Sequence, residues 1–142
     1  MSSTLRVVLW IVGGLAVLLI LVMVAGRLWW RGNSAAFQQA MENGHAAGAR
    51  LTARQCVDSV LHRHAAASDF GQSMPQSLFL GGCLQTARQL PALCAESPDQ
   101  GIMASAQWTL RICHERGLSD RLCPTVLQPL LSACRQASRR GP

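Results

Sequence analysis

The chain has 142 residues and a formal net charge of +6, and it contains arginine but no lysine. Arg6, Arg27 and Arg31 flank an apolar segment, so ten arginines and seven acidic residues remain elsewhere. That small, dispersed surplus argues against the dense basic surface by which proteins bind nucleic acid, and we expect no nucleic-acid partner. The abundance of Ala, Leu, Gln and Arg and the absence of Tyr favour helices.

An uncharged apolar segment near the N-terminus predicts a membrane-spanning helix. Residues 7–26 contain no charged side chain, and a helix of that length covers about 30 Å, the thickness of the hydrocarbon core of a bilayer. We therefore predict a single transmembrane anchor at residues 1–31, with the lipid bilayer as a partner. Gly13 and Gly14 would let two such helices approach, which leaves a homo-oligomer open. The expected membrane-interface residues are Arg6, Arg27, Trp29, Trp30 and Arg31.

The apolar segment is more typical of a retained signal anchor than of a cleaved signal peptide, because it is longer than the usual apolar region of such peptides and lacks a good cleavage site. The arginine distribution slightly favours a cytoplasmic C-terminal domain, whereas the six cysteines favour an oxidising compartment. We give the cysteines more weight. We expect the anchor in the inner (plasma) membrane and the C-terminal domain on its periplasmic or other extracytoplasmic side.

A juxtamembrane stalk is predicted over residues 32–51. Gly32–Ser34 is expected to break the membrane helix, and Gly44 and Gly48 disfavour a regular helix after it. The stalk is therefore expected to be part helix and part linker.

A helical domain is predicted over residues 52–137, and residues 138–142 form a basic tail that we expect to be solvated. The first helix begins at Thr52, where Thr-Ala-Arg-Gln has the form of a capping box. The second begins near Met74 and is stopped by Pro91.

The third and fourth helices are marked by prolines. Ser97 is the expected N-cap of the third, ahead of Pro98 at its first position. The fourth runs over residues 124–137, and Pro129 should kink or shorten it. The residues predicted to face inward repeat every three or four positions: Ala53, Cys56, Val57, Val60 and Leu61 in the first helix, Phe79, Cys83, Ala87 and Leu90 in the second, Ile102, Ala106, Thr109 and Cys113 in the third, and Leu127, Leu130 and Cys134 in the fourth.

The pattern predicts an all-α fold: an N-terminal transmembrane helix followed by a small, disulfide-stapled antiparallel bundle of about four short helices. None of the six cysteines has the spacing of a C-x-x-C redox motif, a haem-attachment site or a zinc site, so structural disulfides are expected. The heights of the cysteines along antiparallel helices predict the pairs Cys56–Cys83, Cys113–Cys123 and Cys94–Cys134.

No group of side chains predicts catalysis, a cofactor or a metal. His62 and His64 point to different sides of a helix, and we expect all four histidines to be solvated or to cap helices. The seven acids show no pairing typical of acid–base catalysis. Trp108 lies off the predicted inner face of its helix and is a possible partner contact, although burial in the core is the commoner fate of a lone tryptophan.

We therefore hypothesise a non-enzymatic single-pass membrane protein, an accessory subunit or adaptor whose exported helical domain binds or helps to assemble another membrane or envelope protein. One alternative is a lipid- or hydrophobe-binding helical module at the membrane surface, which requires a cavity between helices. The other is a cytosol-facing thiol or zinc protein. Its first ligands to test would be Cys94, Cys113, Cys123 and His114.

Overall fold

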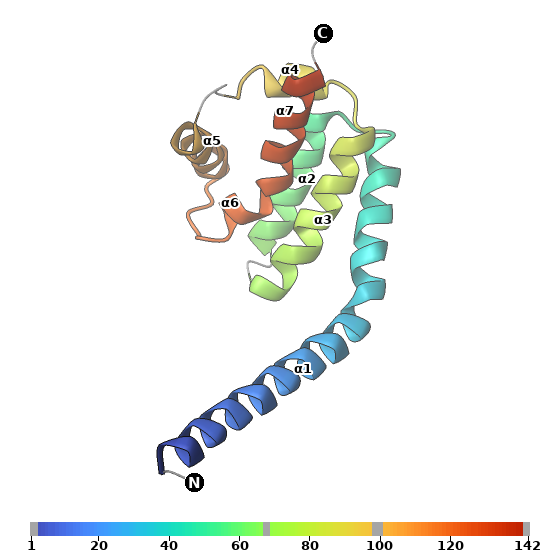
Figure 1. Ribbon diagram of the computed structural model, residues 1–142. Coiled ribbons are helices and arrows are strands. Elements are labelled where there is room, and N and C mark those ends of the chain that lie inside the picture. Colours follow the sequence, from blue (N-terminus) through green and yellow to red (C-terminus); the bar gives the residue numbers. More distant parts are fainter. Residues whose placement is uncertain (1–2, 67–68, 98–100, 141–142) are drawn as a thin grey trace. The chain divides into compact units, whose positions relative to one another are not determined.

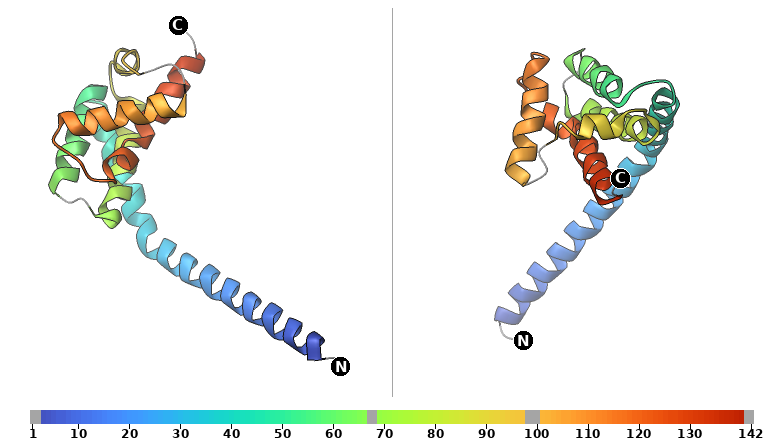
Figure 2. Two further views of the ribbon diagram at one scale, coloured as in Figure 1. Left: turned by 90° about the vertical axis from the view of Figure 1, so that its left-hand side faces the viewer. Right: turned by 90° about the horizontal axis from the view of Figure 1, so that it is seen from above.

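The computed structural model describes residues 3–66, 69–97 and 101–140. Figures 1 and 2 show helices joined by short turns, and no β-strand occurs in the described ranges. The predicted all-α class is therefore confirmed. The chain forms two compact units, and the boundary between them lies between Ala35 and Ala36. The helices are α1 (Ser3–Gly48), α2 (Ala53–Ala66), α3 (Phe70–Thr86), α4 (Leu90–Cys94), α5 (Ile102–Glu115), α6 (Cys123–Val126) and α7 (Gln128–Arg140).

The first unit is the apolar part of α1. Its most apolar 18-residue window has a mean hydropathy of 3.1, and none of that window is buried against the rest of the protein. This helix is long and apolar enough to cross a membrane. Arg27 and Arg31 are exposed on it, as are Trp29 and Trp30, whereas the side chain of Arg6 lies outside the described part.

The predicted helix break at Gly32–Ser34 is wrong, because α1 continues to Gly48. Asn33 Nδ2 donates a hydrogen bond to the carbonyl oxygen of Trp29 at 2.8 Å, and Ser34 Oγ donates one to the carbonyl oxygen of Arg31 at 3.4 Å. Both side chains therefore bond to the preceding turn of their own helix. Their polar groups are therefore satisfied within the helix, which lets these residues occur in its interior although they favour caps and turns.

The second unit begins with the last part of α1, which packs closely on α3. A Cβ atom added at Gly44 would overlap the carbonyl oxygen of Phe79, and one added at Gly82 would overlap the carbonyl oxygen of Met41. Thr86 Oγ1 also donates a hydrogen bond to the carbonyl oxygen of His45 at 2.9 Å. Glycines at this interface therefore allow close contact between two backbones. Residues 36–51 of the stalk expected over 32–51 are therefore part of the second unit.

Side-chain caps position α2 and α3. The backbone N–H of Thr52 donates to Gln55 Oε1 at 2.9 Å and Thr52 Oγ1 accepts from the N–H of Gln55 at 3.3 Å, which is the predicted capping box. α3 begins earlier than predicted, because the Asp69 carboxylate accepts a hydrogen bond from the N–H of Gln72 at 3.0 Å and serves as its N-cap.

Prolines begin helices in the C-terminal half. Pro91 lies in the first turn of α4, a helix that was not predicted. The predicted helix over residues 124–137 is divided at Leu127 into α6 and α7, and Pro129 lies in the first turn of α7, in agreement with the predicted shortening. The start predicted for the third helix falls partly on residues 98–100, outside the described part, and α5 begins at Ile102. α7 extends to Arg140, so the described part of the expected tail is helical.

Three disulfides tie these helices together, and they are the three pairs predicted from the sequence. Cys56–Cys83 joins α2 to α3, Cys94–Cys134 joins α4 to α7, and Cys113–Cys123 joins α5 to α6, with Cα–Cα distances of 6.0, 5.2 and 6.2 Å. All three bridges border one apolar core. Besides the cysteines, the buried apolar residues are Ala53, Val57, Val60, Leu61, Phe79, Leu80, Leu84, Leu93, Trp108, Val126, Leu127, Leu130 and Leu131.

Candidate functional site

A cavity of about 620 Å³ lies between α5 and α7, and we call it the α5–α7 groove. Its volume is within the range of about 300–1,000 Å³ typical of ligand pockets. Figure 1 shows α5 nearly end-on while α7 runs along the picture, so the two helices cross steeply. The lining residues used below are Ile102, Ser105, Ala106 and Leu110 on α5, and Leu131, Arg135, Ser138 and Arg139 on α7.

The outer face of α5 exposes large apolar side chains. The exposed fractions of Ile102, Met103 and Leu110 are 89%, 75% and 45%. Of the inner face predicted for this helix, Thr109 and Cys113 are buried, but Ile102 and Ala106 are exposed, so the prediction is wrong for those two residues. Ile102, Met103 and Leu110 form an uncovered apolar surface of the kind that marks an interaction site, and Ile102 and Leu110 also line the groove.

Trp108 occupies the opposite face of α5 and is buried, with 4% of its surface exposed. It packs in the core with Thr109 and Cys113, which are also buried. Burial in the core, the commoner fate expected for Trp108, is therefore confirmed, and the alternative of an exposed partner contact is wrong. An indole fills more of the core than a branched aliphatic side chain, and this explains why α5 packs inward on its Trp108 face.

Two arginines supply the charge of the groove. Arg135 and Arg139 are exposed on successive turns of α7, and they are the charged side chains among its described lining residues. Within residues 3–66, 69–97 and 101–140, the ion pairs are Arg54–Glu96, His64–Asp120 and Arg116–Asp58, and neither groove arginine belongs to them. The groove is therefore apolar along α5 and positively charged along α7.

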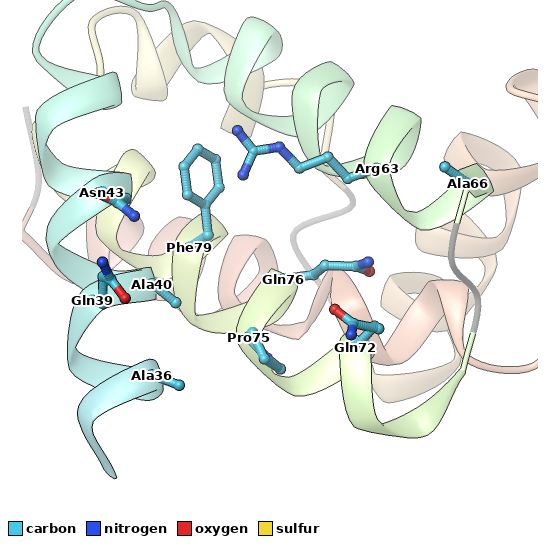
Figure 3. A pocket seen from close by; sticks show the side chains of 10 residues that line it. All are labelled: Ala36, Gln39, Ala40, Asn43, Arg63, Ala66, Gln72, Pro75, Gln76 and Phe79. Atoms are coloured by element: carbon cyan, nitrogen blue, oxygen red, sulfur yellow. The ribbon is translucent and has the colours of Figure 1, made fainter. Parts of the chain in front are cut away.

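A second hollow of about 430 Å³ is bounded by α2, α3 and the last part of α1 (Figure 3). Four carboxamides border it: Gln39 and Asn43 from α1, and Gln72 and Gln76 from α3. The guanidinium carbon of Arg63 lies 4.3 Å from the centroid of the Phe79 ring, so this cation is held against an aromatic face. This hollow is smaller than the α5–α7 groove, and its lining is divided between these polar side chains and the apolar residues Ala36, Ala40, Ala66, Pro75 and Phe79.

His64 is fully buried, which corrects the expectation of a solvated or capping histidine. Its Nε2 atom lies 2.9 Å from Asp120 Oδ1, and its Nδ1 atom lies 3.0 Å from Gln76 Oε1. Because an ionised carboxylate only accepts hydrogen bonds, Nε2 carries the proton toward Asp120. The imidazole joins α2, α3 and the α5–α6 loop, and its burial suits a structural role.

The Asp120 carboxyl is held in its ionised form. Burial raises the pKa of Asp120, but hydrogen bonds from His64 and from the backbone N–H groups of Leu122 and Cys123, together with attraction to His64, outweigh burial and lower the pKa below its ordinary value. Its stabilising contribution is therefore complete above the ordinary aspartate pKa of about 3.9 and is lost as the pH falls through the folded-state pKa.

We expect Asp120→Asn to lower the free energy of unfolding by about 1–2 kcal/mol at pH 7, because the bond from His64 loses its charged acceptor. The deficit should shrink as the pH falls below the ordinary aspartate pKa of about 3.9, because the unfolded wild-type chain then binds a proton more readily than the folded chain does. Urea unfolding at pH 7, 5 and 3 measures this difference. Asp69→Asn is the matched control and should cost only a few tenths of a kcal/mol, since Asn caps helices as well as Asp. A deficit that is equal at all three pH values would contradict the assignment.

The described ranges contain no group of three or more His, Cys, Asp or Glu residues placed to hold a metal ion, and all six cysteines are in disulfides. Comparison with protein-family models, with characterised proteins and with solved structures finds no match to this chain. The residues of the site are therefore the basis for any proposed function.

The feature that best fits a binding function is the α5–α7 groove. Two apolar faces on one helix, through Ile102 and through Trp108, were the signal that could have revealed it.

Proposed function

We propose that this protein is a membrane-tethered adaptor whose exported helical domain binds another envelope protein through the α5–α7 groove. It acts by presenting a rigid docking surface and carries out no chemistry of its own. The observation that carries the proposal is the uncovered apolar surface of α5 beside the groove. A small domain held together by three disulfides does not need this surface for its own core.

The location of the domain is part of the proposal. The helix that could span a membrane lies near the N-terminus, and all three disulfides lie after it in the chain. Disulfides persist in oxidising compartments and are rare in the cytosol. These features support a domain on the periplasmic or other extracytoplasmic side of the plasma membrane. Disulfide pairing also removes the thiolate ligands that the zinc hypothesis requires.

Site-specific photocrosslinking in intact cells tests the proposal. A benzophenone-bearing amino acid replaces Ile102 or Leu110 in the full chain, and the matched control replaces Phe70, which is 71% exposed but does not line the groove. Irradiation should give one discrete protein adduct from positions 102 and 110, and none from position 70. Maleimide labelling of the same cells, before and after reduction, should modify the cysteines only after reduction.

Three other outcomes of these experiments would contradict the proposal. An adduct that forms equally from Phe70 would show contact without a defined site, and the proposed docking surface would fail. Cysteines that react before reduction would place the domain in a reducing compartment. An adduct with lipid and no protein would favour the alternative of a lipid-binding module.

A further inference from the structure

We infer that the α5–α7 groove receives an acidic amphipathic helix of the partner, whose apolar side packs on α5 and whose carboxylates pair with Arg135 and Arg139. This inference rests on the proposed function, because it specifies the chemistry of the partner at the same site. Three features of the groove support it: a recess between large side chains, an apolar surface wider than the groove, and the spacing of the two arginines.

The recess lies on the α5 wall. Ile102, Ala106 and Leu110 are four residues apart in turn, so they share one face of the helix, and all three line the groove. The small side chain of Ala106, between two large ones, leaves space for an inserted side chain. Packing of a large residue from one helix into such a gap on another is the usual basis of helix–helix association.

The apolar surface extends beyond the groove. Met103 follows Ile102, is turned by about 100° around the helix axis and is 75% exposed, although it does not line the groove. A single acyl chain would fill the groove and leave Met103 in water. A helix presents a broader apolar face that covers both residues, and the flexible methionine side chain adapts readily to such a partner. The surface therefore fits a protein helix better than a lipid chain.

The charges specify the polar side of the partner. Arg135 and Arg139 are four residues apart, which places them about 6 Å apart along α7. Carboxylates four residues apart on a helix lying along α7 have the same spacing. Guanidinium groups bind carboxylates in a two-pronged geometry, and the described lining of the groove contains no acidic residue that would compete.

Charge reversal in the photocrosslinking experiment tests the inference. The full chain carries the benzophenone amino acid at position 102, together with Arg135→Glu and Arg139→Glu. The matched control carries Arg50→Glu and Arg121→Glu, which make the same change in net charge at exposed positions outside the groove. We expect the groove pair to reduce the yield of the protein adduct at least tenfold and the control pair to leave it within twofold. Migration as the fully disulfide-bonded form on a non-reducing gel confirms that each variant has folded.

The partner side supplies a second readout. Mass spectrometry of the adduct identifies the crosslinked segment, which should be a helix-forming sequence with two acids four residues apart, and changing those acids to arginine should restore crosslinking to the charge-reversed chain. A protein adduct that survives reversal within twofold would overturn the acidic-helix inference and leave the adaptor proposal standing. An adduct with lipid alone, with a second copy of this chain alone, or no adduct at all would overturn both.

Discussion

We expect the paired substitution Cys94→Ala and Cys134→Ala to lower the free energy of unfolding by about 4 kcal/mol, because this bridge closes a loop with a sequence separation of 40 residues. The same loop-entropy argument gives about 2.7 kcal/mol for Cys113–Cys123, whose separation is 10 residues. Against a total stability of about 5–15 kcal/mol, the loss of the longer bridge removes a large share. For a helical unit of about 100 residues it corresponds to a fall in Tm of roughly 15–30 °C.

Urea unfolding of the detergent-solubilised chain, followed by far-UV circular dichroism, measures both losses. The paired Cys113→Ala and Cys123→Ala variant is the matched control, since it also removes one bridge and two sulfur atoms from the core. Cys94 and Cys134 line the α5–α7 groove, so their removal should also weaken photocrosslinking from position 102. If the shorter bridge proved the more stabilising, the loop-entropy account of this domain would be wrong.

Gly82→Ala should cost about 2 kcal/mol. The added methyl group would overlap the backbone carbonyl of Met41, which cannot rotate away. The overlap by itself, before any gain in helix propensity, therefore costs near the upper end of the roughly 1–3 kcal/mol usual for overpacking. The higher helix propensity of alanine offsets at most about 1 kcal/mol of it. The expected result is separation of the last part of α1 from α3 before the rest of the domain unfolds.

The neighbouring residue provides the control. At Gly81 an added Cβ would lie 3.7 Å from the Cβ of Pro129, an ordinary van der Waals contact. Gly81→Ala should therefore be neutral or stabilise the fold by up to about 1 kcal/mol. Thermal unfolding of both variants decides the question, and amide hydrogen exchange over residues 36–48 shows whether α1 has detached. Equal effects at the two positions would mean that close backbone packing is not what requires glycine here.

Sequence patterns were most successful on helices with a single apolar face. In α2 and α7 the predicted inner residues, Val60 and Leu130 among them, are buried. The disulfide pairs also follow from such patterns, because short turns make successive helices antiparallel and so set the heights of the cysteines. Where one face of a helix is apolar and the other polar, the spacing of the apolar residues identifies the buried face.

Periodicity could not resolve α5, because both of its faces carry apolar residues. One passes through Ile102 and Leu110, the other through Trp108 and Ile112, and only the packed structure shows which is covered. Gly44 was misinterpreted for a related reason. Its low helix propensity was weighed as if the segment were isolated, whereas packing on α3 favours a residue without a side chain.

The buried His64–Asp120 pair had no local signal at all. The two residues are 56 positions apart, and neither stands in a motif. Their contact depends on how the α5–α6 loop meets the end of α2, which is a product of tertiary packing. An ion pair between such distant segments could therefore not be predicted from the sequence.

The order of the disulfides along the chain has a consequence for how the protein matures. The bridge Cys113–Cys123 is nested inside the loop closed by Cys94–Cys134, whereas Cys56–Cys83 stands alone before them. An oxidase that joined cysteines in the order in which they are synthesised would make the first bridge correctly. It would then join Cys94 to Cys113 and Cys123 to Cys134, and both links would be non-native. The C-terminal half can reach its native pairing only if its helices assemble before oxidation or if an isomerase reshuffles the early bonds.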